Sequence, residues 1–125
     1  MINSRNLLQL DAAFRLQTMK WLDACQKIGL DILVVCTFRD DEYQNFLYAQ
    51  GRTTAGKICT NAKGGASMHN KRKALDFCVM DGKSCDWEDS AGFTKAGLLA
   101  EGFGLVWAGR WNGNLKELGH IEAQH

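Results

Sequence analysis

The chain has 125 residues, of which 46% are hydrophobic, a composition typical of one soluble globular domain with a modest core. Its formal net charge is +1, so no whole-protein field favours nucleic acid or a membrane surface. No apolar run approaches the length of a transmembrane helix. We therefore expect one domain over residues 1–125 that acts as a monomer, without a nucleic-acid partner or a membrane span.

The N-terminus and the cysteines indicate where the chain folds. Residues 1–5 precede an amphipathic, charged stretch that lacks the apolar core of a signal peptide. The five cysteines form no CxxC motif, and several lie in apolar runs. We expect synthesis in a cytosol and five reduced thiols that neither bind metal nor form a disulfide. These are Cys25, Cys36, Cys59, Cys78 and Cys85.

The first predicted element is one long helix over residues 4–28. Asn3 or Ser4 can cap its start, and Gly29 can end it. Its apolar side chains recur with a period near 3.6, so we expect them to face the core. They are Leu7, Leu10, Phe14, Trp21, Leu22, Cys25 and Ile28.

A strand and a second helix follow. Residues 31–37 form a β-branched apolar run typical of a buried strand. Asp40 or Asp41 then caps a helix that runs to Gln50 and is closed by Gly51. Arg39 stands between strand and helix, where functional side chains are common. From the residues alone, an ion pair with one of the neighbouring acids is an equal alternative for this arginine.

Residues 51–66 form a predicted loop with three interior glycines and turn-forming Thr and Asn residues. From Gly51 to Leu75 there are six Lys or Arg and no acid. These cations form either a solvated basic surface or a surface that attracts an anionic wall polymer.

The second half of the chain predicts short strands and one helix. We expect strands over 74–79, 104–107 and 119–123, a turn at Asp81-Gly82, and a helix over 90–101. No regular βαβ rhythm appears, which favours an α+β fold with a small antiparallel sheet. Trp107 and Trp111 flank a Gly-rich turn, where they serve either as core or as the wall of a groove.

One pattern carries chemistry. Asp76 lies inside the apolar run 74–79, and burying a carboxylate costs several kcal/mol unless it is paired or binds metal. His69 precedes it with six residues between, and Glu117-x-x-His120 follows. Two histidines and one carboxylate can hold Zn2+ and leave its fourth position open, with Glu117 to spare. The alternative is a loop histidine, an aspartate paired with lysine, and a solvated surface pair.

The order Ser-x-His-x(6)-Asp then Glu-x-x-His, with its flanks, resembles the zinc peptidases that cut bacterial cell-wall peptides. These include D-Ala-D-Ala carboxypeptidases and dipeptidases and phage L-alanyl-D-glutamate endopeptidases. The flanks are Thr37-Phe38-Arg39 with Gln44, the run Tyr48–Thr53, and residues 104–111. The resemblance covers residues 31 to 120. The phage endolysin branch fits best, because of the Tyr-Ala-Gln-Gly-Arg-Thr run and the short length.

The resemblance implies a sheet flanked by helices that carries a zinc site, of the hedgehog and D-Ala-D-Ala peptidase type. It implies Zn2+ bound by His69, Asp76 and His120, with Glu117 as the general base. Its substrate is the peptidoglycan stem peptide, reached after release through a phage-made membrane hole. The implied substrate-binding residues are Arg39, Gln44, Ser67 and Trp107.

The chain departs from the family at several positions. Ala55 stands where relatives often have Pro, and Arg72 where they have Gly. Glu117 resembles the carboxypeptidase branch, whereas many phage relatives carry Asp. Three alternatives therefore stand beside the endopeptidase: a D-Ala-D-Ala carboxypeptidase, a non-catalytic zinc-stabilised wall-binding module, and a plain globular domain.

Overall fold

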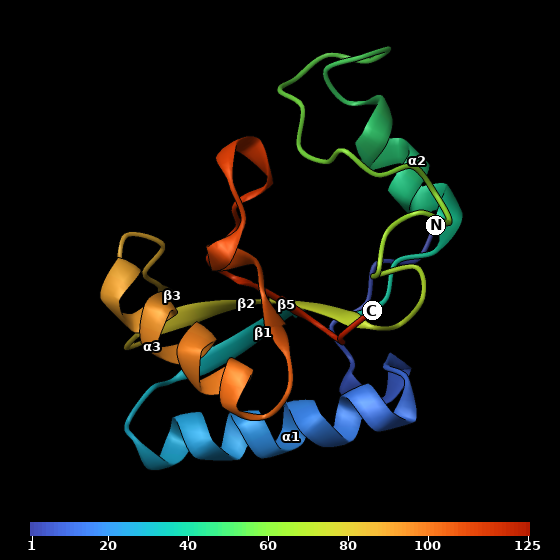
Figure 1. Cartoon of the computed structure of the whole chain (residues 1–125). Helices are drawn as coiled ribbons and strands as arrows, with labels where there is room; N and C mark the ends of the chain where they lie inside the picture. Colours follow the sequence, from blue (N-terminus) through green and yellow to red (C-terminus); the bar gives the residue numbers. More distant parts are fainter.

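A five-stranded antiparallel sheet forms the centre of the computed structural model, which describes all 125 residues (Figure 1). Its path is β1-β2-β5-β4, with β3 paired to β2, and every pairing is antiparallel. The predicted α+β class is thus confirmed. The strands are β1 (Ile32–Cys36), β2 (Ala74–Asp81), β3 (Ser84–Cys85), β4 (Val106–Trp107) and β5 (His120–Glu122).

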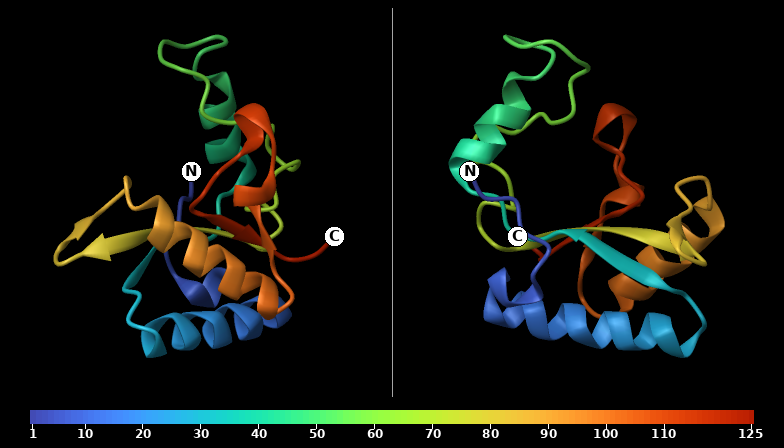
Figure 2. Two further views of the ribbon diagram at one scale, coloured as in Figure 1. Left: turned by 60° about the vertical axis from the view of Figure 1, so that its left-hand side comes forward. Right: turned by 180° about the vertical axis from the view of Figure 1, so that it is seen from behind.

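Three α-helices surround the sheet: α1 (Ala12–Lys27), α2 (Asp41–Ala49) and α3 (Ser90–Gly102). Helices α1 and α3 lie on one side of the sheet, whereas α2 and the long loops rise from the other (Figures 1 and 2). Three single 3-10 turns complete the chain, at Leu7–Gln9, Ala108–Arg110 and Gly113–Leu115. None of the helices combines the length and the apolarity needed to span a membrane.

The core lies between β2 and the helices α1 and α3. Alternate residues of a strand face opposite sides of the sheet, so Leu75 and Phe77 enter the core while Asp76 points away. The ring of Phe77 lies 5.0 Å from Trp21 and 5.6 Å from Phe93. The helices thus leave one sheet face, carrying Asp76, open to a site.

The N-terminal segment differs from its prediction. Helix α1 begins at Ala12, where the Asp11 carboxylate accepts a hydrogen bond from the backbone N–H of Phe14. Upstream, residues 2–6 run beside residues 37–40: Ser4 N donates to Phe38 O, and Thr37 N donates to Ser4 O. The expectation of a helix from residue 4, capped by Asn3 or Ser4, is wrong because these backbone groups bond to the segment after β1.

Trp107 packs into the core. Its indole Nε1–H donates to the Leu118 carbonyl at 2.9 Å, and the side chain is buried. Glycine is required on both sides of the ring, since a Cβ at Gly97 or Gly109 would lie 2.1 Å from it. Of the two roles considered for Trp107, the structure shows core packing.

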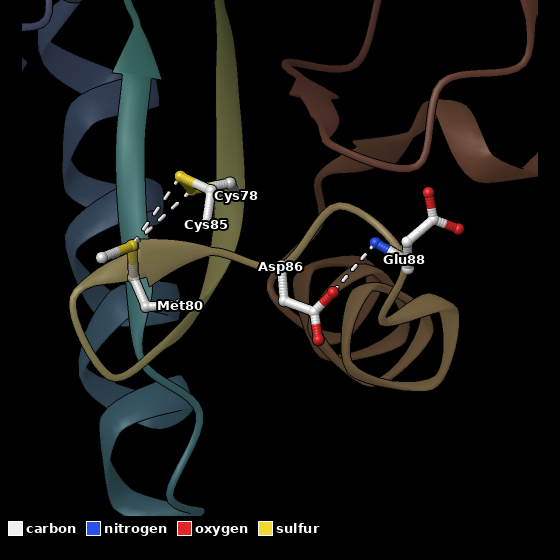
Figure 3. The surroundings of a disulfide bond; sticks show 5 residues. All are labelled: Cys78, Met80, Cys85, Asp86 and Glu88. Atoms are coloured by element: carbon white, nitrogen blue, oxygen red, sulfur yellow. Dashed lines mark hydrogen bonds between the residues drawn. A yellow bond between two sulfur atoms is a disulfide. The ribbon is translucent and has the colours of Figure 1, made fainter.

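A disulfide joins Cys78 to Cys85 across the β2–β3 hairpin (Figure 3). The Asp81-Gly82 turn folds β3 back onto β2, and Met80 pairs with Cys85. Cys78 lies two residues before Met80, on the same side of the strand, so the two sulfurs meet diagonally. The expectation of five free thiols is therefore wrong, and Cys25, Cys36 and Cys59 remain free.

Arg72 fastens the N-terminal segment to the turn before β2. It is the one non-glycine residue with a positive φ, at 63°. Its Nη1 donates to the carbonyl and the side-chain oxygen of Gln9, at 3.0 and 2.7 Å. Its guanidinium also lies 3.8 Å from the centre of the Phe38 ring. These contacts offset the cost of a left-handed backbone, which is about 1–2 kcal/mol for a residue with a Cβ.

We expect Arg72→Gly to be more stable than Arg72→Ala by about 1 kcal/mol. Both variants lose the contacts of the Arg72 side chain with Gln9 and Phe38. Only the alanine variant keeps the strain of a left-handed backbone at a residue with a Cβ. Urea unfolding measures the difference, with Lys71→Gly and Lys71→Ala as the control pair. Lys71 lacks a positive φ, so alanine should be the more stable residue there. Equal stability of the two Arg72 variants would contradict the argument.

Candidate metal centre

The sheet register brings two of the three candidate ligands, Asp76 and His120, together. Asp76 in β2 pairs directly with His120 in β5, and on its other side it pairs with Cys36 in β1. His69 lies in the loop before β2. The Ser67 hydroxyl accepts a hydrogen bond from the His69 N–H at 3.2 Å.

Both predicted histidine ligands approach the same carboxylate oxygen of the third ligand, Asp76. Asp76 Oδ1 lies 2.9 Å from His120 Nδ1 and 3.3 Å from His69 Nε2. Glu117 Oε2 lies 3.6 Å from His120 Nδ1. Ligand atoms of Asp76, Glu117 and His120 lie within 4.8 Å of one another, and Cys36, His69 and Asp76 form a second such group. The three predicted ligands are thus divided between the two groups, and Asp76 belongs to both.

The other ring nitrogens show which atoms face the site. His69 Nδ1 lies 2.9 Å from the Thr37 carbonyl, which can only accept, so Nδ1 carries the hydrogen. His120 Nε2 lies 2.8 Å from Glu122 Oε1, which places its hydrogen there. The lone pairs of neutral His69 and His120 thus point toward Asp76.

This donor set fits a zinc ion. Lone pairs facing a carboxylate repel unless a cation or protons lie between them. Two imidazole nitrogens and one carboxylate oxygen form the ligand set of open zinc sites. Outer partners of ligating histidines are also typical of zinc centres, and Thr37 and Glu122 supply them.

The pKa shifts of His69, His120 and Asp76 show that the site favours a positive charge beside the Asp76 carboxylate. Burial disfavours the imidazolium of His69, but hydrogen bonds to Asp76 and Cys36 outweigh it and raise its pKa to about 10. Burial also disfavours the charged form of His120, but hydrogen bonds to Asp76 and Glu122 outweigh this effect and raise its pKa to about 9. Burial opposes ionisation of Asp76, yet the two histidines hold its pKa well below the usual range. In the metal-free protein, protons take the place of a cation.

Glu117 differs from the ligands in its surroundings. Its side chain is half exposed, and no hydrogen bond holds its carboxylate, in contrast to Asp76 and Glu122. Partial burial raises the pKa of the Glu117 carboxyl above its usual value, although the charge of His120 opposes the shift. A carboxylate of this kind, beside the ligands, can accept and release a proton.

A cleft of about 780 Å³ opens over these residues. One wall comes from residues 58–62 and 66–68, and the other from residues 111–117; both segments rise from the same side of the sheet (Figure 2). Arg39, Ser67 and Glu117 line the cleft together with the candidate ligands. Gln44 and Trp107, also predicted to bind substrate, are not among its lining residues.

Arg39, which lines the cleft, is hydrogen-bonded to Gln44, which does not. Arg39 Nη2 donates to Asp76 Oδ2 at 3.1 Å, and Nη1 donates to Gln44 Oε1 at 3.3 Å. The buried Nε of Arg39 has no protein partner. Gln44 is fully buried and donates to Thr60 Oγ1 and the Ala62 carbonyl. Gln44 therefore ties the arginine to the cleft wall.

The sequence analysis missed Glu122 and left Trp111 undecided. Glu122 is buried on the same face of β5 as His120, a relation that the spacing His-x-Glu in a strand could have indicated. The ring of Trp111 lies 5.6 Å from that of His120 and lines the cleft. Of the two tryptophans, Trp111 is the one in a groove wall.

The chain matches a family model over most of its length. The model of VanY, D-alanyl-D-alanine carboxypeptidase, matches residues 5–116, a region that contains His69 and Asp76. A relative, the peptidoglycan L-alanyl-D-glutamate endopeptidase CwlK of Bacillus subtilis (strain 168), is 35% identical over 104 residues. The alignment covers 75% of this chain and 61% of that relative. The chain thus spans less than two thirds of the length of CwlK.

Solved structures show the same fold. The L-Ala D-Glu endopeptidase ChiX of Serratia marcescens superposes with a TM-score of 0.68 at 14% identity, covering 98% of this chain and 89% of that one. The LD-carboxypeptidase LdcB gives 0.72 at 16%, with coverages of 91% and 58%. A mutant of the D,D-pentapeptidase VanY in complex with Zn(II) gives 0.67 at 15%, with coverages of 91% and 72%. Because the family model matches residues 5–116 of the 125, the chain belongs to the VanY D-alanyl-D-alanine carboxypeptidase family.

Proposed function

We propose that the protein is a zinc metallopeptidase that hydrolyses the stem peptide of bacterial peptidoglycan, at the bond between L-alanine and D-glutamate. The observation that carries this proposal is the convergence of His69, Asp76 and His120 at a cleft that Glu117 also lines. Membership of the VanY family and the 35% identity to an L-alanyl-D-glutamate endopeptidase support the choice of substrate.

In the proposed mechanism, His69, Asp76 and His120 hold the zinc ion. Zinc at such a site lowers the pKa of water to about 7 and polarises a carbonyl. Glu117 accepts the proton of the attacking water and then delivers it to the nitrogen of the leaving amine. The absence of a fixed partner leaves the Glu117 carboxylate free for both transfers.

Arg39 is the proposed anchor for a substrate carboxylate. A D-glutamate linked through its side chain keeps a free α-carboxylate beside the scissile bond. Arg39 lines the cleft next to Asp76, so a bidentate contact there would hold this carboxylate close to the metal. Gln44, which accepts from Arg39, fixes the position of the guanidinium from behind.

A D-Ala-D-Ala carboxypeptidase is the second candidate. The family description favours it, and so does Glu117, which occupies a position where phage endopeptidases often carry Asp. Arg39 would then hold the terminal carboxylate of the peptide. Arg39 alone does not distinguish the two substrates, so the bond cleaved has to be measured.

We further propose that the protein acts on the cell wall as a phage endolysin. The support is the run Tyr48–Thr53, which resembles that branch. In the structure Arg52 donates from Nη1 to the Tyr48 and Thr60 carbonyls and stacks on the Tyr48 ring at 3.8 Å. The run thus holds together the base of the loop that forms one cleft wall.

Digestion of purified peptidoglycan tests the proposed bond. We expect zinc-loaded protein to release fragments with a new N-terminal D-glutamate, identified by mass spectrometry after labelling of free amines. Release of D-alanine alone would assign the protein to the carboxypeptidase branch. Binding to peptidoglycan without any new N-terminus or free D-alanine would favour a non-catalytic wall-binding module.

The change Arg39→Lys is expected to reduce hydrolysis by about 10²-fold while zinc stays bound. Lysine keeps the charge but loses the two-pronged geometry for a carboxylate. The rate of fragment release and the zinc content measure the two effects. Arg5→Lys, at an exposed site that is not part of the cleft lining, is the control and should retain full activity. Full activity of Arg39→Lys would show that no bidentate contact is made.

A further inference from the structure

We propose that Glu122 is a positioning residue that fixes the ring of His120, so that the Nδ1 lone pair faces Asp76 and the cleft. The role of the ring toward zinc rests on the proposed function. The contact between Glu122 and His120 stands on the geometry alone. Neither the family match nor the names of the relatives assign a role to Glu122.

The strand places the two residues in register. His120 and Glu122 are two residues apart in β5, so their side chains point to the same face of the sheet, while Ile121 between them enters the core. Both side chains are buried. The distance from His120 Nε2 to Glu122 Oε1 is 2.8 Å, a good hydrogen bond to a carboxylate.

The carboxylate decides which nitrogen is left for the site. An ionised Glu122 only accepts hydrogen bonds, so Nε2 carries a hydrogen and Nδ1 of the neutral ring keeps its lone pair. Nδ1 is the atom that lies 2.9 Å from Asp76 Oδ1 and 3.6 Å from Glu117 Oε2. Without Glu122, the ring could rotate or carry its hydrogen on the wrong nitrogen.

His69 offers an internal comparison. Its outer nitrogen is held by the neutral carbonyl of Thr37 at 2.9 Å. That of His120 is held by a charged carboxylate, which makes the imidazole a stronger donor to a cation. The two rings therefore present opposite nitrogens, Nε2 of His69 and Nδ1 of His120, to the same oxygen of Asp76.

Glu122 is unsuited to the other roles available to a buried acid. It holds Nε2, on the edge of the His120 ring away from Nδ1, so it cannot bind the same ion as Nδ1 while making this bond. Glu122 lines the cleft, but its second oxygen accepts from His125 Nε2, so both of its oxygens are hydrogen-bonded, in contrast to the carboxylate of Glu117. Orientation of His120 is the role that remains.

Three variants test the inference: Glu122→Gln, Glu122→Leu, and Glu88→Leu as a control that removes an exposed acid. Zinc affinity is measured by competition with a chromophoric chelator, independently of hydrolysis. We expect Glu122→Leu to bind zinc about 10–100-fold more weakly, the range typical of outer partners. Glu122→Gln, whose amide oxygen still accepts, should recover most of that loss, and Glu88→Leu should match the parent.

A second measurement uses the metal-free protein. The Nε2–H proton of His120, bonded to buried Glu122, should give a slowly exchanging NMR signal that survives in Glu122→Gln and disappears in Glu122→Leu. A parent protein that binds no zinc would overturn the proposed function, while this proton still decides the contact with Glu122. A parent without the signal, or Glu122→Leu with both the signal and parental zinc affinity, would overturn the inference.

Discussion

The change Glu117→Gln is expected to lower the rate of peptide hydrolysis by about 10²–10⁴-fold, while the fold and the zinc content stay unchanged. Glutamine keeps the size of the side chain and removes only its ability to take a proton. Glu117 is half exposed and makes no hydrogen bond through its carboxylate, so its loss should leave the core and the ligands undisturbed. Initial rates on purified peptidoglycan and elemental analysis measure the two quantities.

The matched control is Glu88→Gln, which makes the same chemical change at an exposed carboxylate remote from the cleft. Three outcomes separate the roles of Glu117. Loss of activity with full zinc supports the general base. Loss of zinc as well would make Glu117 a ligand, which its distance of 3.6 Å from His120 Nδ1 would allow after a small movement. Full activity would place the base elsewhere.

Local patterns predicted the elements near the site because each has its own start and stop signals. Helix α2 begins after Asp40, whose carboxylate accepts from Tyr43 N as an N-cap, and it ends just before Gln50. The strand holding Asp76 was recognisable as an apolar run interrupted by one acid. An acid there has to be compensated, so the odd residue led directly to its partners.

The parts that were mispredicted depend on contacts distant in sequence. The apolar period over residues 4–28 extends beyond α1 because Leu7 and Leu10 also pack in the core region, although neither belongs to that helix. Backbone bonds between Ser4 and the segment after β1 outweigh helix propensity there. Trp107 enters the core because Gly97, in another element, leaves room for its ring.

The disulfide and Glu122 were missed for a related reason. An odd cysteine count says nothing about which two sulfurs meet, and only the register of β2 against β3 brings Cys78 to Cys85. Glu122 looked like one more charge near the end of the chain. Its burial follows from the neighbouring strands, since β5 lies between β2 and β4.

Removal of either histidine ligand is expected to have the largest effect on metal binding. The protein should carry about one zinc per chain, whereas His69→Ala and His120→Ala should lose zinc affinity by well over the ~10–100-fold typical of outer partners. Hydrolysis should fall with it. Lys20→Ala is the control, because Lys20 is exposed and does not line the cleft. Undiminished zinc in both ligand variants would reject the metal centre.

Zinc removal should also change how stability depends on pH. In the metal-free protein the pKa values of His69 and His120 are raised to about 10 and 9, from 6.5. Their protons therefore stabilise the fold fully below about pH 6.5, and this contribution is lost as pH rises through 9–10. Zinc should replace the protons, so the gain in Tm on adding zinc to chelated protein should be larger at pH 9 than at pH 6. An equal gain at both pH values would show that zinc and these protons do not compete for one site.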